Sequence, residues 1–158
     1  MPTLTYIPLQ TITLGSAASS VTFASIPQTY RDLVVVSDFT TSASASRVEI
    51  QSNSVTSGYS TVIAFSTGSQ AFSTPGFYHG YTEGNTRCTS IMQIMDYSAT
   101  DKHKTSLNRH GTLSSPSLVM MAASRFSSND AITTLKVLPL NATTFATGST
   151  FSLYAIEA

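Results

Sequence analysis

The chain has 158 residues, a size that fits one domain with one hydrophobic core. Its eight basic residues balance eight acidic ones, only 10% of residues are charged, and 41% are hydrophobic. A neutral chain lacks the dense positive charge that nucleic-acid binding requires, and no apolar run approaches the ~18 residues of a membrane helix. The single cysteine excludes an internal disulfide and a multi-cysteine metal site. We therefore expect a single domain over residues 1–158, with no nucleic-acid and no membrane partner.

Serine and threonine dominate the composition, with 26 and 24 residues, whereas lysine and glutamate number three each. Threonine and other β-branched side chains suit a pleated sheet, while helices favour alanine, leucine, lysine and glutamate. Scarce charges also leave few ion pairs between residues four apart, which would stabilise a helix. The composition therefore favours an all-β fold.

The first predicted strands are short alternating segments that end at turn residues. Residues 11–14 alternate and then meet Gly15, and residues 20–23 alternate again. Residues 32–37 follow as a continuous apolar run of strand length. Each of these three segments is expected to form one strand.

Segment 47–51 alternates most clearly of all, with Val48 and Ile50 facing inward and polar neighbours outward. A stretch rich in Gly, Ser and Pro, residues 67–76, predicts a long surface loop. The remaining predicted strands are 59–65, 77–81, 89–97, 105–109, 118–123, 132–138 and 149–156. Strands that recur roughly every 8–14 residues without helical periodicity indicate a two-sheet sandwich or a barrel.

The three histidines, His79, His103 and His110, show no metal-binding spacing. On one continuous strand His103 and His110 would lie roughly 23 Å apart, too far for one metal ion or one proton relay. We therefore expect solvated or hydrogen-bonded histidines without a functional role.

Other catalytic patterns are also missing from the sequence. It contains no G-x-S-x-G motif and no glycine-rich phosphate loop. The pairs Asp32/Asp38 and Asp96/Asp101 flank a strand and a turn, where aspartate usually forms turns. Cys88 is expected to be a buried structural thiol rather than a nucleophile. The sequence thus predicts no enzymatic activity and no cofactor.

The densest charge in the chain is the segment Lys102-His103-Lys104. Such a cluster can bind an acidic partner surface or a phosphate. A solvated strand edge is the commoner use, because lysine at an edge prevents pairing between sheets. We expect the edge, and we keep Lys102 and Lys104 as candidate partner-binding residues.

Four aromatic residues, Phe72, Phe77, Tyr78 and Tyr81, fall in or beside the predicted loop. Each can pack in the core like the other aromatic residues of the chain. Aromatic side chains in a loop can instead anchor a protein partner or a sugar. These four are the second set of candidate partner-binding residues.

Motifs near the two ends of the chain are similar to a known group of proteins. The matching segments are 12–23, 26–35, 131–135 and 145–156. Their central patterns are Ile-Pro followed by Tyr-x-Asp-Leu, and Gly-Ser-x-Phe-x-Leu-Tyr. These segments resemble short β-rich virion proteins and tail-fibre domains of tailed bacteriophages, especially phages of cyanobacteria and marine bacteria. The chain departs from that group at Ala155, where glycine is usual, and around residues 124–126, where a tryptophan is common.

The resemblance implies a jelly-roll-like, two-sheet antiparallel β-sandwich that is carried on the virion and has no enzymatic activity. We expect a capsid decoration (cement) protein that binds and stabilises the head shell. Its partners would be the major capsid protein or other virion proteins, together with copies of itself in a trimer or dimer. The alternative is a tail-fibre or receptor-binding module that recognises host surface polysaccharide.

Overall fold

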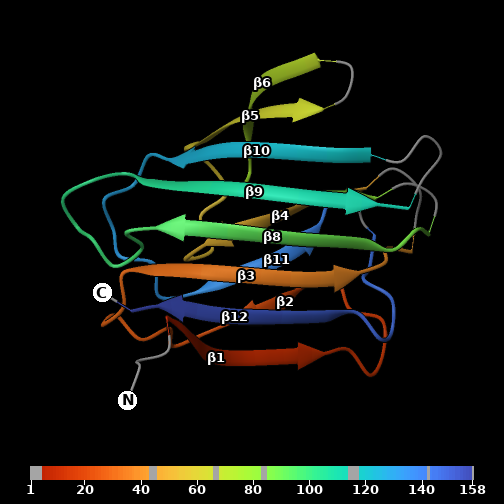
Figure 1. The fold of residues 1–158 in the computed structure, drawn as a ribbon, viewed down its shortest axis with the longest axis horizontal. Helices are drawn as coiled ribbons and strands as arrows, with labels where there is room; N and C mark the ends of the chain where they lie inside the picture. Colours follow the sequence, from red (N-terminus) through yellow and green to blue (C-terminus); the bar gives the residue numbers. More distant parts are fainter. Residues whose placement is uncertain are drawn as a thin grey trace.

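The computed structural model describes residues 5–42, 46–65, 68–82, 85–113, 118–141 and 143–157. These residues form two antiparallel sheets and no helix (Figure 1), so the prediction of an all-β sandwich is confirmed. The strands are β1 (Tyr6–Thr13), β2 (Val21–Phe23), β3 (Asp32–Phe39), β4 (Ser46–Ser52), β5 (Tyr59–Phe65), β6 (Gly68–Thr74), β7 (Phe77–Thr82), β8 (Cys88–Met95), β9 (Lys104–Thr112), β10 (Leu118–Phe126), β11 (Leu135–Pro139) and β12 (Thr150–Ile156).

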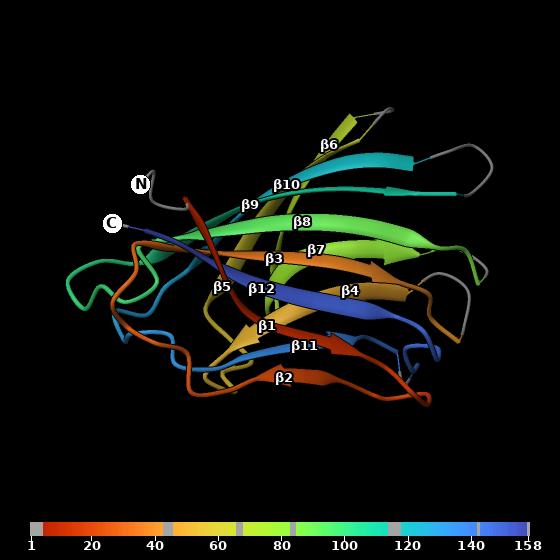
Figure 2. The same ribbon diagram turned by 60° about the horizontal axis from the view of Figure 1, so that its bottom comes forward.

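Eight of these strands form a jelly roll. β1 pairs with β12, β2 with β11, β3 with β8 and β4 with β7, so the pairs are nested like the two arms of one long hairpin. Rolling up that hairpin adds the pairs β12–β3 and β11–β4. The result is two facing sets of four strands, β1-β12-β3-β8 and β2-β11-β4-β7 (Figure 2). This nesting is the double Greek key of a jelly roll, as expected.

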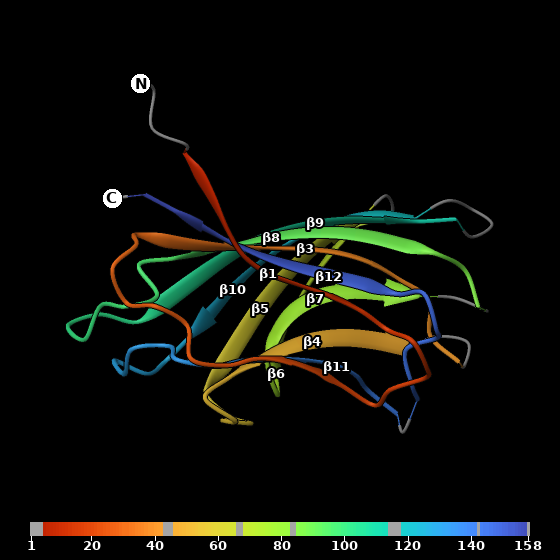
Figure 3. The ribbon, with the colours of Figure 1, turned by 90° about the horizontal axis from the view of Figure 1, so that it is seen from below.

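Two inserted hairpins widen only one of the sheets. β9 and β10 are inserted between β8 and β11, and β5 and β6 between β4 and β7. Together they continue the large sheet in the order β9-β10-β5-β6. Figure 3 shows that this extension bends towards the small sheet, where β5, β9 and β10 contact its edge strand β7. The bend positions the groove described below.

The main core lies between the two sheets and contains closely packed aromatic rings. The rings of Phe145 and Phe151 have centroids 4.8 Å apart, and Phe39 packs against both. Tyr59 stacks on Phe126 with centroids 4.3 Å apart. Tyr59 and Phe151 occupy inward positions of strands that the alternation predicts. Phe145 lies outside the named strands, and Phe39 and Phe126 lie just beyond the predicted strand ends.

The predicted loop 67–76 is wrong over residues 68–74, which form β6 and pair along their whole length with β5. Most side chains of β6 are exposed, so no alternation of apolar residues identifies the strand. Its backbone pairs with β5 along its whole length, and only Phe72 and Thr74 turn side chains inward. The other predicted strands are confirmed with shifted ends; the strand predicted at 132–138 begins only at Leu135.

Candidate functional site

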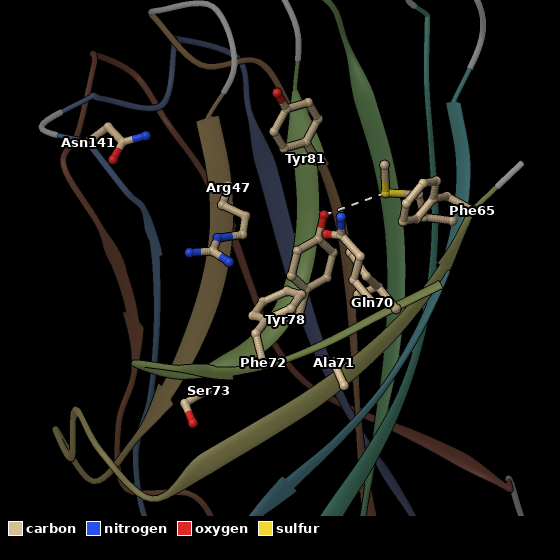
Figure 4. Close-up of a pocket in the computed structure, with 11 residues that line it drawn as sticks. Arg47, Phe65, Gln70, Ala71, Phe72, Ser73, Tyr78, Tyr81 and Asn141 are labelled. Carbon is tan, nitrogen blue, oxygen red and sulfur yellow. Dashed lines mark hydrogen bonds between the residues drawn. The ribbon is translucent and has the colours of Figure 1, made fainter. Parts of the chain in front are cut away.

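A groove lies where the bent end of the large sheet approaches the outer face of the small sheet (Figure 4). β4 and β7 contribute one wall, and β5, β6 and β10 contribute the other. The groove is open to solvent and has a volume of about 790 Å³. Small-molecule sites typically measure ~300–1,000 Å³, so this groove can hold a ligand of that size.

Three of the four predicted aromatic candidates line this groove: Phe72, Tyr78 and Tyr81. The predicted loop is wrong for Phe72, which lies on β6, whereas the two tyrosines lie on β7, the strand predicted at 77–81. Phe72 and Tyr81 are partly exposed, whereas Tyr78 is almost fully buried. The Tyr78 hydroxyl lies 3.6 Å from the Met120 sulfur, to which it donates a hydrogen bond (dashed line in Figure 4).

A β-bulge explains why Tyr78 and Tyr81 face the same side although they are three residues apart. Opposite β4, Tyr78 pairs with Glu49 and Gly80 with Val48, so His79 is an extra residue on β7. The bulge reverses the alternation between the two tyrosines, and Tyr81 pairs with Arg47. A strict two-residue period would have placed the tyrosines on opposite faces.

Phe77, the fourth aromatic candidate, lies in the main core and has no exposed surface. Its ring centroid is 5.2 Å from that of Tyr59. It is the first residue of β7, as the predicted strand 77–81 indicates, and its use as an exposed loop aromatic is therefore wrong. A side chain buried in this way offers no surface to a partner.

Arg47 and Glu49 form an ion pair behind the groove, with 3.6 Å between Arg47 Nε and Glu49 Oε1. Glu49 is fully buried, and neither carboxylate oxygen has a hydrogen-bond partner in the described structure. Burial raises the pKa of Glu49 from 4.5 to about 7, against the opposing effect of the Arg47 charge. The Arg47 guanidinium lies 5.0 Å from the centre of the Phe72 ring, so it also makes a cation–π contact.

Besides Arg47, the described polar groups of the groove are two amides, the Ser73 hydroxyl and the phenols of Tyr78 and Tyr81. Gln70 and Asn141 line it and are exposed, and the partly exposed Tyr81 lies beside Arg47 (Figure 4). Sequence reasoning did not select Arg47, Gln70 or Asn141 as candidates. The alternation in segment 47–51 does indicate that Arg47 faces outward, but no sequence signal indicates that β5 and β6 approach that face.

The two candidate lysines differ in burial. Lys102 is exposed, with its amine 3.5 Å from an Asp96 carboxylate oxygen. Lys104 is fully buried, and its amine donates hydrogen bonds to the carbonyls of Lys102 and Asn129. The expectation of a solvated strand edge is wrong, because β9, which Lys104 begins, is paired on both sides by β8 and β10. Burial lowers the pKa of Lys104.

The outer face of the large sheet carries a second candidate surface. Its apolar residues Val62, Met95, Leu107, Met121 and Ala123, here called the outer patch, surround two shallow hollows. Val62, Leu107 and Met121 are each more than half exposed, and Ala123 pairs with both Val62 and Leu107. No other layer of the described residues covers this face, because the small sheet packs against the opposite one.

In the described structure no histidine lines the groove or the hollows of the outer patch. His79 is buried between the sheets, where its Nε2 lies 2.8 Å from Ser37 Oγ, and His103 is exposed. These two match the expectation of a hydrogen-bonded or solvated histidine. His110 does not, since it is buried and neither ring nitrogen has a partner in the described structure. Burial lowers the pKa of His79 to about 3 and that of His110 to about 4.

Cys88 is buried in the main core, as expected. Burial raises the pKa of its thiol to about 12, so the thiol stays protonated and unreactive at neutral pH. Neighbouring Arg87 is held by Asp38, with 2.6 Å between Nε and Oδ1. Among the described residues, no three His, Cys, Asp or Glu side chains are close enough together to hold a metal ion.

No protein-family model matches the chain, and no curated protein shows significant sequence similarity to it. No helix in the described part of the chain is long and apolar enough to cross a membrane. The groove and the outer patch are therefore interpreted from their own geometry.

Proposed function

We propose that the chain is a non-enzymatic structural protein of a phage virion, and specifically a capsid decoration protein that binds the head shell through the outer patch. The end motifs support the phage origin through their resemblance to virion proteins. A jelly roll of two tightly packed sheets supports a structural role, because it presents its outer surfaces on a rigid frame. The partner would be the major capsid protein or another virion protein.

The single observation that carries this proposal is the outer patch. Exposed apolar side chains on a sheet face lose contact with water when a partner covers them, and contiguous patches of this kind mark protein interfaces. Leu107, at the centre of the patch, lines both hollows, and a complementary surface can fill these. The patch has a polar and charged surround that includes Arg109 and Arg125, as is common at the rim of an interface.

Symmetric assembly would strengthen such contacts. A decoration protein binds many equivalent sites on one head, and a trimer or dimer of this chain would engage several sites at once. The second and third contacts are then intramolecular, so avidity exceeds the affinity of one patch. Because avidity adds the contacts of several copies, each copy can attach to the head through a small apolar patch.

The test is binding of the purified protein to phage heads from which it has been stripped. Leu107→Thr and Met121→Thr should each weaken binding at least tenfold without lowering the melting temperature, because both side chains are exposed in the free protein. Leu113→Thr is the matched control, since Leu113 is exposed but lies beyond the end of β9, outside the patch. Undiminished binding by both patch variants would contradict the assignment of this face.

A second measurement addresses the cement role itself. Heads with and without the bound protein are heated or diluted from high salt, and release of DNA is followed. Decorated heads should rupture at a higher temperature or after a larger osmotic shock. Equal stability of the two preparations would contradict a cement role.

A further inference from the structure

We propose that the groove between β7 and the β5–β6 hairpin binds an acidic saccharide, with Arg47 holding a carboxylate of the sugar and the rings of Phe72 and Tyr81 contacting its apolar faces. This binding site adjoins the outer patch, because Phe72 lines both the groove and one hollow of the patch. It explains why Phe72, Tyr81, Gln70 and Asn141 expose their side chains in the groove, which packing of the fold does not require.

Arg47 is the first part of the argument. Among the described residues that line the groove, it is the only one with a permanent charge, and none of them is a carboxylate. In the described structure Nε of the guanidinium faces Glu49 and its plane contacts the Phe72 ring, while its two terminal Nη groups make no side-chain hydrogen bond and can donate. A guanidinium with free donors binds a carboxylate with two parallel hydrogen bonds.

Glu49 determines how much positive charge Arg47 offers. Its carboxyl group lies behind Arg47, is fully buried and is not itself a lining residue. Because burial favours the neutral form of this carboxyl, it cancels only part of the Arg47 charge near neutral pH. The groove is thus electrostatically complementary to an anion rather than to a cation.

The aromatic and amide groups indicate a sugar rather than a simple anion. Phe72 and Tyr81 present partly exposed rings, and sugars pack the C–H groups of their flat faces against such rings. Gln70 and Asn141 each offer both donors and acceptors, and neither side chain forms a hydrogen bond to another described residue. Such groups pair with ring hydroxyls, which also donate and accept.

The shape of the groove agrees with a polymeric ligand. It is open rather than enclosed, and its volume of about 790 Å³ exceeds what one small anion would occupy. A chain of several sugar units can therefore enter and leave along it. The groove-lining residues of β5 and β10 face away from the outer patch, whereas Ala71, Phe72 and Ser73 of the edge strand β6 line both the groove and one hollow at the patch.

The experiment uses the purified full-length protein and a printed array of acidic and neutral oligosaccharides from bacterial surface polysaccharides. We expect binding to carboxylated oligosaccharides. Titration with the best of them and with its carboxyl-reduced form should show at least tenfold weaker binding of the reduced form. Binding of no carboxylated oligosaccharide on the array, or equal binding of the two forms, would overturn the proposal.

Variants connect that binding to the groove. Arg47→Gln should weaken binding of the carboxylated oligosaccharide at least tenfold, and Gln70→Ala should weaken it several-fold. Gln70 is exposed, so this second variant remains informative if loss of the Arg47 ion pair lowers the melting temperature. Leu113→Thr is the control and should bind like the unaltered protein. Wild-type affinity in both groove variants would overturn the assignment.

Discussion

Met120 and Met121 are neighbours on β10 and face the two different candidate surfaces. Met120 is 9% exposed, accepts a hydrogen bond from the Tyr78 hydroxyl and lines the groove. Met121 is 57% exposed and belongs to the outer patch. The two-residue period of one strand therefore places the groove on one side of the large sheet and the proposed head-binding face on the other.

Alanine substitutions at these two positions should separate stability from attachment. Met120→Ala removes buried side-chain atoms from the smaller core cluster and is expected to cost ~2 kcal/mol of unfolding free energy. Met121→Ala should change that free energy by less than ~0.5 kcal/mol but weaken head binding. Urea denaturation gives the first quantity and co-sedimentation with stripped heads the second. Similar losses of stability in both variants would contradict the described orientation of β10.

Glu49 makes stability depend on pH in a predictable direction. Its pKa is about 7 in the folded protein, above the ordinary value of 4.5, while Arg47, Tyr59 and Tyr78 lie around it on β4, β5 and β7. The folded protein therefore keeps a proton between pH 4.5 and pH 7 that the unfolded chain releases. The contribution of Glu49 to stability is complete below pH 4.5 and is lost as the pH rises to about 7.

Glu49→Gln tests this dependence, because glutamine has a similar shape and no titrating proton. Relative to the unaltered protein, the variant should gain stability as the pH rises from 4.5 to 7, by up to ~3 kcal/mol. Glu157→Gln removes an exposed carboxylate and is the control. Chemical denaturation at several pH values gives the difference. A constant difference between Glu49→Gln and the unaltered protein would rule out a buried Glu49 that stays protonated up to about pH 7.

Much of the fold is predictable from the sequence because alternation records which side chains are buried. Val48 and Ile50 face the core as expected, and the closing strand alternates between Phe151 and Leu153 inside and Tyr154 outside. The end motifs led to the expected jelly roll, whose nested strand pairs the structure describes.

The groove is not predictable in the same way. Alternation places Glu49 outward, yet it has no exposed surface, because the extension of the large sheet covers that face of β4. A pattern in one strand shows which side chains share a face and cannot show which distant strand covers it. Lys104 illustrates the same limit, since its charge favours an edge while β9 is an interior strand. The alternation does not identify β6, because most of its side chains are exposed.

His110 has the opposite pH dependence to Glu49. Its pKa is about 4 when folded and 6.5 ordinarily, so the unfolded chain binds the proton first as the pH falls. The His110 contribution to stability is present above pH 6.5 and is lost as the pH falls towards 4. The His110 ring lies close to His79, and positive charges on the two rings would repel each other. The centroids of the His110 and Tyr78 rings are 5.8 Å apart.

His110→Leu should therefore be at least as stable as the unaltered protein at pH 7, because it removes two buried nitrogens that lack partners in the described structure. Its advantage should grow by up to ~3 kcal/mol as the pH falls from 6.5 to 4. His103→Leu, at an exposed position, is the control. If acid destabilises His110→Leu as steeply as the unaltered protein, the burial of His110 does not cause the acid sensitivity.

Gly76 sits in the turn between β6 and β7, against the backbone of β4. A Cβ atom at this position would lie 2.8 Å from the Ile50 carbonyl oxygen and 3.3 Å from the Gln51 nitrogen. Backbone atoms cannot move aside as the end of a side chain can, so Gly76→Ala must displace the turn that covers Glu49. We expect a loss of ~1–3 kcal/mol in unfolding free energy.

Gly15→Ala is the matched control for Gly76→Ala, because a Cβ atom at Gly15 meets nothing within 4 Å. Its unfolding free energy should stay the same or rise slightly, since alanine restricts the unfolded chain more than glycine does. Displacing the turn should also open the groove wall, so Gly76→Ala is expected to weaken oligosaccharide binding while Gly15→Ala is not. Thermal denaturation and the oligosaccharide titration give the two results. Equal stability of both alanine variants would mean that the β6–β7 turn does not pack on β4 as described.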